Sequence, residues 1–179
     1  DIHTTNQRLA ELESRDKAKT FIYALLYGAG DAKLGSVVGR GRAVGKGLRQ
    51  RFFDNLPAFK KLTDRVQRES KSGFVKGLDG RKLTVRSEHA ALNTLLQGAG
   101  SIVMKQALIV LNNKIAKHGY DAKFVANVHD EWQIECSIDD AVDVGKLGVL
   151  ALREAGCMFK LNCPLDGAYK VGENWSETH

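Results

Sequence analysis

The segment from Glu88 to His118 constrains the fold more than any other part of this 179-residue sequence. Its apolar residues recur three and four positions apart, and Gly119 follows directly after it. This spacing predicts one long helix, because residues three and four apart lie on the same side of an α-helix. We therefore expect it to be the main core element. Its apolar positions are Leu92, Leu95, Leu96, Ala99, Ile102, Val103, Leu108, Leu111 and Ile115.

Shorter elements precede and follow this helix. Ser14 is placed to cap a helix that begins at Arg15, and Pro57 suits the first turn of a later helix. Asp79-Gly80, between two short apolar runs, is a hairpin turn signal. The predicted class is α+β, with helices dominant and a short antiparallel sheet. Expected helices cover 4–12, 15–27, 31–38, 41–54, 57–70 and 138–155, and expected strands lie near 74–75, 83–85, 124–128, 132–136 and 166–171.

Composition excludes several classes of function. No stretch approaches the run of about eighteen apolar residues that a membrane span needs. The three cysteines lack the close pairing of a zinc site and are odd in number, so we expect no disulfide framework and a reducing cytoplasm. The sequence opens on Asp1 without an initiator Met, so we expect a piece of a longer chain. The cysteines are Cys136, Cys157 and Cys163.

Positive charge is concentrated in one third of the chain. Residues 31–86 hold fifteen Lys and Arg against five Asp and Glu, whereas residues 137–179 hold four against seven. Such a block is either a solvated face or a surface that contacts phosphates. Charge alone leaves both open.

A second feature is a set of four polar residues at a four-residue spacing, within the helix expected over 15–27. Each step of four turns only about 40° around a helix, so the first three share a face. Arg offers a planar fork and Lys a point charge to phosphate oxygens, and an aromatic ring can pack on a sugar or base. The alternative is a solvated helix face. The residues are Arg15, Lys19, Tyr23 and Tyr27.

The stretch VANVHDEWQIEC carries His129, Asp130 and Glu131 at the point where the second hairpin should reverse. If the flanking strands pair, Trp132 and the alternate residues after it pack on one face, and Glu131 points to the other. Adjacent carboxylates repel each other, and they are tolerated in open water or around a divalent cation such as Mg²⁺. An exposed turn and a metal site therefore both remain possible.

A polar stripe runs along the long helix, where His89, Asn93 and Gln97 recur every four residues. Asn and Gln can donate hydrogen bonds to the base acceptors of the DNA minor groove. A helix that shows its polar face to water would have the same pattern.

Taken in order, these segments resemble the C-terminal half of the family A (bacterial polymerase I-like) DNA polymerase domain. The carriers are DIHT, the four-residue repeat that ends in Tyr27-Gly28, LDGR, HAALNTLLQGAG, VHDE and the terminal GENW followed by His179. The sequence is most similar to the replicative polymerases of short-tailed phages. The resemblance implies a fingers subdomain over 1–86, with its nucleotide-binding helix at about 15–27. It implies a C-terminal palm over 87–179, with a long helix at 88–118 and a catalytic hairpin at 124–136.

The resemblance also implies roles for the residues of the first candidate site. Arg15, Lys19 and His3 would face the phosphates of an incoming deoxynucleoside triphosphate (dNTP), and Lys19 could protonate the leaving pyrophosphate. Tyr23 would lie beside the sugar, and Tyr27 where the templating base enters, with Gly28 allowing a close approach.

The same resemblance assigns DNA-binding and metal-binding residues. The polar stripe His89, Asn93 and Gln97 would touch the primer-template through its minor groove, and His129 would lie near the primer end. Asp130 matches the second of two palm aspartates that hold a pair of Mg²⁺ ions, with Glu131 as a further catalytic acid beside it.

One motif of this family is missing from the sequence. The other metal aspartate lies in an upstream motif of the type Asp-x-Ser-x-x-Glu-Leu-Arg, which these residues do not contain. One ligand set for Mg²⁺ is then incomplete, so we expect these residues to be inactive alone and to need the upstream polymerase region, from the same longer chain or a second polypeptide. The alternative is a non-catalytic DNA-binding or nucleotide-binding accessory module derived from this fold. Either protein would act in the cytoplasm, that of the host cell if phage-encoded, without a membrane partner.

Overall fold

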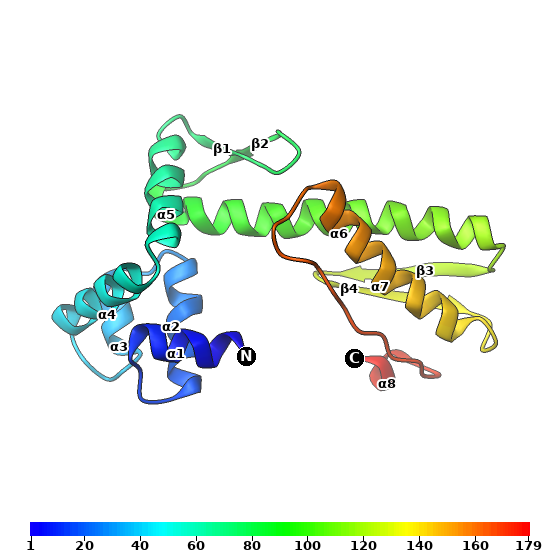
Figure 1. The fold of residues 1–179 in the computed structure, drawn as a ribbon, viewed down its shortest axis with the longest axis horizontal. Coiled ribbons are helices and arrows are strands. Elements are labelled where there is room, and N and C mark those ends of the chain that lie inside the picture. Colours follow the sequence, from blue (N-terminus) through cyan, green and yellow to red (C-terminus); the bar gives the residue numbers. More distant parts are fainter. The chain divides into compact units, whose positions relative to one another are not determined.

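Eight α-helices and four short strands form in the computed structural model, which describes residues 1–179 (Figure 1). The strands make two separate two-stranded antiparallel sheets, so the predicted α+β class with dominant helices is confirmed. The chain divides into two compact units, Asp1–Gln97 and Gly98–His179, and the division falls inside the long helix.

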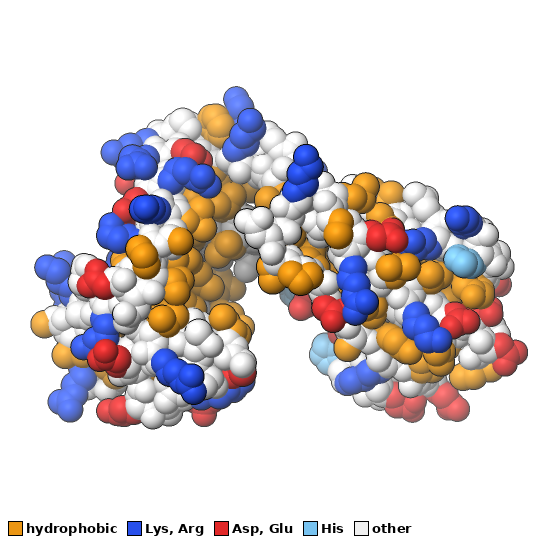
Figure 2. All heavy atoms as spheres, viewed as in Figure 1, with side chains coloured by type: hydrophobic (Ala, Val, Ile, Leu, Met, Phe, Trp, Pro, Cys, Tyr) orange, Lys and Arg blue, Asp and Glu red, His pale blue; other side chains and the backbone are white.

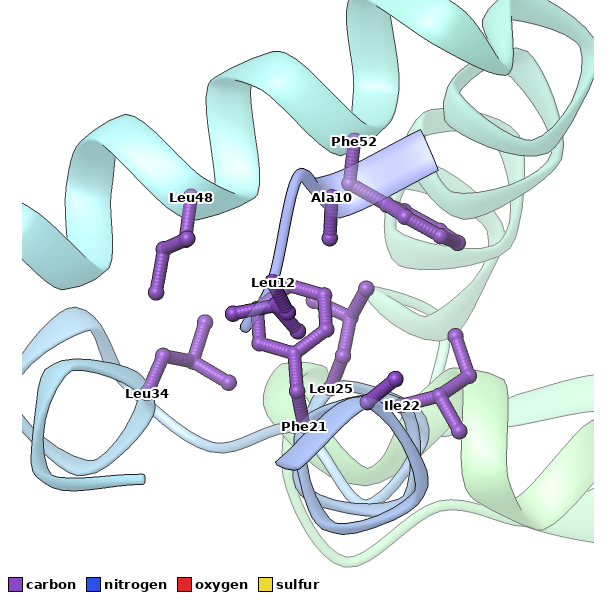
Figure 3. Packing of buried hydrophobic residues seen from close by; sticks show 9 residues of the cluster. Ala10, Leu12, Phe21, Ile22, Leu25, Leu34, Leu48 and Phe52 are labelled. Atoms are coloured by element: carbon purple, nitrogen blue, oxygen red, sulfur yellow. The ribbon is translucent and has the colours of Figure 1, made fainter. Parts of the chain in front are cut away.

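The first unit begins with five helices that enclose an aromatic and aliphatic core. Phe21 and Phe52 are almost completely buried, and their rings meet edge to face with centroids 5.7 Å apart (Figure 3). Leu34 and Leu48 close the same core from two other helices. Burial of these four side chains holds the helices together. The helices are α1 (Ile2–Ala10), α2 (Arg15–Leu26), α3 (Asp31–Ser36), α4 (Arg42–Asn55) and α5 (Pro57–Ser70).

A small hairpin completes the first unit. Strands β1 (Phe74–Lys76) and β2 (Lys82–Thr84) pair antiparallel around the predicted Asp79-Gly80 turn, where Gly80 has a φ of 85°. A short 3₁₀ helix, η1 (Glu88–Ala90), then leads into the long helix α6 (Ala91–His118). A second cluster, formed by Val66, Val75 and Ala91, packs the hairpin between α5 and the start of α6.

The second unit contains the remainder of α6, the second hairpin and helix α7. Strands β3 (Ala122–Val128) and β4 (Glu131–Cys136) pair antiparallel, with a register shift at Val125. As predicted from the alternation, Trp132, Ile134 and Cys136 face the core that Leu111 of α6 occupies. The other elements are α7 (Ala141–Met158) and the four-residue α8 (Trp175–Thr178).

Two predictions in the C-terminal part are wrong. The expected edge strand at 166–171 does not form, because this segment has no strand beside it to supply ladder hydrogen bonds. It follows α7 instead, where glycines leave room for its side chains: the Tyr169 ring lies against Gly145, and Leu165 lies against Gly156. Helix α7 also begins three residues later than expected, since the residues from Ser137 first make a turn closed by the Asp140 N–H.

Helix α6 is longer and more apolar than most core helices. Counted from Glu88 to His118, it contains an 18-residue window of mean hydropathy 1.4, so its length and composition would allow it to cross a membrane. The core helix of a soluble protein meets the same criterion, and Ala107, Leu111 and Ile115 of α6 are buried in the second unit. Apolar composition therefore reflects core packing here.

Candidate functional site

Helix α2 is held in one rotation by its cap and its buried face. The Ser14 hydroxyl accepts a hydrogen bond from the Lys17 backbone N–H at 3.2 Å, as its sequence position predicted. Ala18, Phe21, Ile22 and Leu25 fill the core side. The opposite side is open, and Tyr23 and Tyr27 are 47% and 58% exposed. The four regularly spaced residues Arg15, Lys19, Tyr23 and Tyr27 are all exposed, with Tyr27 directly after the last helical residue.

Helix α1 brings two more side chains to this helix. The Asp1 carboxylate caps α1 and forms an ion pair with Arg15, with 2.7 Å between Oδ2 and Nε. The His3 ring lies 6.2 Å from the Tyr23 ring, centroid to centroid, and its Nδ1 is buried without a hydrogen-bond partner. His3, Arg15 and Tyr23 therefore belong to one neighbourhood. The sequence did not indicate Asp1, whose contribution depends on how two helices pack.

The end of α2 packs against the start of the polar stripe. Gly28 has a φ of 79°, and a Cβ atom there would lie 2.1 Å from the His89 carbonyl oxygen. The close approach expected at this glycine is thus made by the protein's own backbone. His89 lies in η1 and is exposed, Asn93 is half-buried on α6, and Gln97 is exposed. The first unit therefore places the predicted nucleotide face and the predicted minor-groove residues at adjoining segments.

The basic block of residues 31–86 is only partly neutralised by ion pairs. On α5, Lys60 pairs with Asp64 at 2.6 Å and Arg65 with Glu69 at 3.7 Å. Other cations have no such partner, and Figure 2 shows Lys and Arg gathered over α4, α5 and the first hairpin. Both a solvated face and a phosphate-contacting surface remain consistent with this arrangement. The exposed cations of α5 and its C-terminal end without an ion pair are Lys61, Arg68 and Lys71.

The tip of the β3–β4 hairpin presents Asp130 to solvent. Val128 pairs with Glu131, which leaves His129 and Asp130 as a two-residue turn, and His129 adopts a φ of 53°. Asp130 is exposed, and its carboxylate makes no hydrogen bond or ion pair within the chain. An open groove of about 1040 Å³ in the second unit is lined by Asp130, Glu131 and residues of α7 and the C-terminal segment.

Glu131, in contrast, is held by three donors. Its Oε1 accepts hydrogen bonds from the Gln133 side chain and from the Trp175 indole N–H at 2.9 Å, and its Oε2 lies 3.0 Å from His179 Nδ1. The Gln133 bond, then His179 and Trp175, lower the pKa of Glu131 below its ordinary value. Thr178 also donates to Gln133 at 3.1 Å. Sequence reasoning placed Gln133 on the same face as Glu131 but gave no signal for Trp175.

The two acids fit part of a Mg²⁺ site. No group of three or more His, Cys, Asp or Glu side chains in the chain is arranged to hold a metal ion by itself. Mg²⁺ commonly binds through one or two carboxylates together with water and substrate phosphates. Asp130 has free carboxylate oxygens, whereas those of Glu131 already accept hydrogen bonds. Asp130 is therefore the better ligand of the two.

Comparison with known proteins settles the family. The family model for DNA polymerase family A matches residues 1–177. The chain belongs to DNA polymerase family A. This family A chain is 45% identical over its whole length to a DNA-directed DNA polymerase of Enterobacteria phage T3, and 44% identical to that of Escherichia phage T7. It is also 34% identical, over 92% of its residues, to DNA polymerase I of Aquifex aeolicus.

This family A chain spans about three-tenths of the length of these relatives, between 29% and 30%. Its fold is also that of a solved polymerase. The POL domain of Pol1 from M. smegmatis, determined in complex with a DNA primer-template and dNTP, superposes with a TM-score of 0.78. The match covers 87% of this chain and 31% of the solved chain at 22% sequence identity, so it shows a shared fold.

Proposed function

We propose that this chain carries the nucleotide-binding face and one metal-binding carboxylate of a template-directed DNA polymerase. The reaction transfers a deoxynucleotidyl group from a dNTP to the 3′-OH of a primer. The observation that carries the proposal is the exposed face of α2, where Arg15 and Lys19 lie one turn apart with Tyr23 following, in a chain of this family. Two cations and an aromatic ring match the phosphates and sugar of a dNTP.

Within the first unit, each residue of this face has a distinct task. Arg15 and Lys19, with His3 from α1, would bind the triphosphate, and Lys19 would also protonate the pyrophosphate as it leaves. The Tyr23 ring would pack beside the sugar, next to the His3 ring that it already faces at 6.2 Å. Tyr27, which is more exposed, would lie where the templating base enters.

The polar stripe would contact the new base pair. His89, Asn93 and Gln97 present donors that suit the minor-groove acceptors, which all correct base pairs offer in similar places. A polymerase must accept every sequence while it checks the geometry of each pair, so this degenerate pattern suits it. His129, at the tip of the second hairpin, would lie near the primer end.

In the second unit, Asp130 would bind Mg²⁺, with Glu131 beside it as a further catalytic acid. A pair of Mg²⁺ ions, when bound, lowers the pKa of the primer hydroxyl and neutralises charge on the leaving group. The free Asp130 oxygens would hold an ion there, and the three donors on Glu131 would keep that side chain in place.

We further propose that these residues need the upstream polymerase region to act, and that the complete enzyme works in the cytoplasm of its host cell. They contain Asp130 but not the motif of the second metal aspartate. A two-metal site without one of its bridging carboxylates loses most of its catalysis. Primer extension by these 179 residues alone, with Mg²⁺ and dNTPs, would contradict this part of the proposal.

The central test is primer extension by these residues joined to the upstream polymerase region. Asp130→Asn should abolish extension while leaving DNA affinity unchanged, because it removes the ligand charge without changing the size of the side chain. Asp121→Asn, which removes an exposed acid from the other end of the same hairpin, is the matched control. Normal extension by the Asp130 variant would refute the metal role.

A second test addresses the nucleotide face. Arg15→Ala and Lys19→Ala should raise the dNTP concentration needed for half-maximal extension. Lys17→Ala removes the same charge from the same helix, but Lys17 pairs with Glu13, so this variant should behave like the wild type. Unchanged dNTP dependence in both test variants would exclude the phosphate-binding role.

The alternative is an accessory module that binds DNA or nucleotide without catalysis. The unpaired carboxylate of Asp130 argues against it, since an acid beside a DNA backbone weakens binding unless a cation lies between them. An accessory module predicts that Asp130→Asn tightens DNA binding and that no joined form extends a primer.

A further inference from the structure

We propose that Asp1 is a positioning residue, which orients the Arg15 guanidinium toward the triphosphate. This inference rests on the proposed nucleotide-binding role of Arg15. A single oxygen, Asp1 Oδ2, accepts hydrogen bonds from Arg15 Nε at 2.7 Å, from the Thr4 backbone N–H at 3.3 Å and from the Thr4 hydroxyl at 3.1 Å. One carboxylate therefore both caps α1 and holds the arginine of α2.

The atom that Asp1 engages decides what Arg15 can still bind. A guanidinium has five N–H donors, and the contact at Nε leaves the four donors of the two terminal nitrogens unused. Arg15 has no other hydrogen-bond or ion-pair partner within the chain, and about half of its side chain (51%) is exposed. These terminal nitrogens form the fork that can bind two phosphate oxygens at once. Asp1 thus fixes the base of the fork and leaves its binding edge open.

The same oxygen also fixes the neighbouring histidine. As the N-cap of α1, Asp1 sets the first turn of the helix that carries His3. The His3 ring faces Tyr23 on α2, and its Nδ1 is buried with no partner in the chain. Asp1 therefore links the side chains of two helices that are proposed to meet one ligand.

The pair is exposed, so its main contribution is geometric rather than stabilising. The Asp1 and Arg15 side chains are 44% and 51% exposed, and ion pairs in such positions contribute little to folding. A residue that served only stability would change dNTP use little when replaced. An acid that only repelled phosphate would hinder binding, and its removal would tighten dNTP binding. A positioning role predicts the opposite sign, with weaker dNTP binding.

The experiment uses the polymerase in which these residues are joined to the upstream region. Asp1→Ser keeps a side chain that caps α1 but is too short to reach Arg15. We expect the KM for dNTP to rise about fivefold, the size of one exposed charge-assisted contact, with a smaller change in kcat. In an Arg15→Ala background the same substitution should have no further effect. Glu13→Ser, which breaks another exposed acid–cation pair next to α2, is the matched control.

Asp1→Asn tests the same idea without the loss of an acceptor. Its amide oxygen can both cap α1 and accept from Arg15 Nε, so its KM should lie between those of the wild type and Asp1→Ser. An unchanged or lower KM in Asp1→Ser, or an equal rise with Arg15 absent, would overturn the inference. If Arg15→Ala itself leaves the KM unchanged, the proposed function of the α2 face fails; if only Asp1→Ser does, the positioning role alone fails.

Discussion

Replacing Gly28 with alanine would test the contact that joins the two candidate sites of the first unit. Gly28 has a φ of 79°, and an added Cβ would lie 2.1 Å from the carbonyl oxygen of His89 and 2.8 Å from its carbonyl carbon. Both are backbone atoms, so no change of side-chain rotamer can relieve the overlap. Either the end of α2 or the η1 segment must move.

The expected cost follows from three contributions. Holding alanine in the left-handed region costs about 1 kcal/mol relative to glycine. Displacing packed atoms around an added methyl group costs a further ~1–3 kcal/mol. The smaller conformational freedom of alanine in the unfolded chain offsets about 0.4–1 kcal/mol. We therefore expect Gly28→Ala to lower the free energy of local opening around α2 and η1 by about 2 kcal/mol.

Hydrogen exchange of the polymerase that contains these residues measures this opening directly. Amides of α2 and of residues 88–95 should lose about 30-fold in protection, the equivalent of about 2 kcal/mol. Gly47→Ala is the control, because a Cβ there meets nothing within 4 Å and the residue lies inside α4. It should stabilise that helix by about 0.5–1 kcal/mol. Wild-type protection in Gly28→Ala would refute the contact with His89.

Three further predictions concern the core and the C-terminal segment. Phe52→Ala should lower the free energy of unfolding by about 3–5 kcal/mol in urea titrations, since the ring is 1% exposed; a loss under about 1 kcal/mol would contradict this packing. Trp175→Phe keeps the ring but removes the indole N–H from Glu131, so primer extension should slow at unchanged DNA affinity, whereas an unchanged rate would show that this contact is dispensable. Arg153→Ala should raise the pKa of Asp166 only partway, because the Gly167 N–H, the larger cause of its lowering, remains. A lowered carboxylate pKa stabilises the fold above the unfolded pKa and is lost as pH falls through the folded pKa, so the variant should lose this small contribution at higher pH in an NMR titration.

Local patterns predicted most of the elements because their causes are local. The apolar spacing of 88–118 sufficed for the long helix, although its first turn, 88–90, is 3₁₀. Ser14 caps α2, Asp79-Gly80 forms a turn, and the alternation after Glu131 turns Trp132 toward the core, all as predicted. Each depends on residues within a few positions of one another. The family resemblance, confirmed by comparison, rested on motif order and needed no coordinates.

Longer-range features could not be predicted in this way. The segment 166–171 has a strand-like sequence, but a strand needs a partner, and α7 offers Gly145 and Gly156 instead. Its outcome depended on residues up to about two dozen positions away, which no local pattern describes. The roles assigned to the candidate residues stay predictions until the variants are measured.

The sequence by itself determined the family, the helix periods and the identity of the candidate residues, because these depend on residue type and spacing. Only the tertiary structure decided which of them are prepared for a ligand. It holds Arg15 through Asp1, seats Gly28 against His89 and clamps Glu131 with Trp175, while it leaves Asp130 free. These contacts join residues 14, 61 and 44 positions apart, and such pairs form only when whole helices and strands have packed.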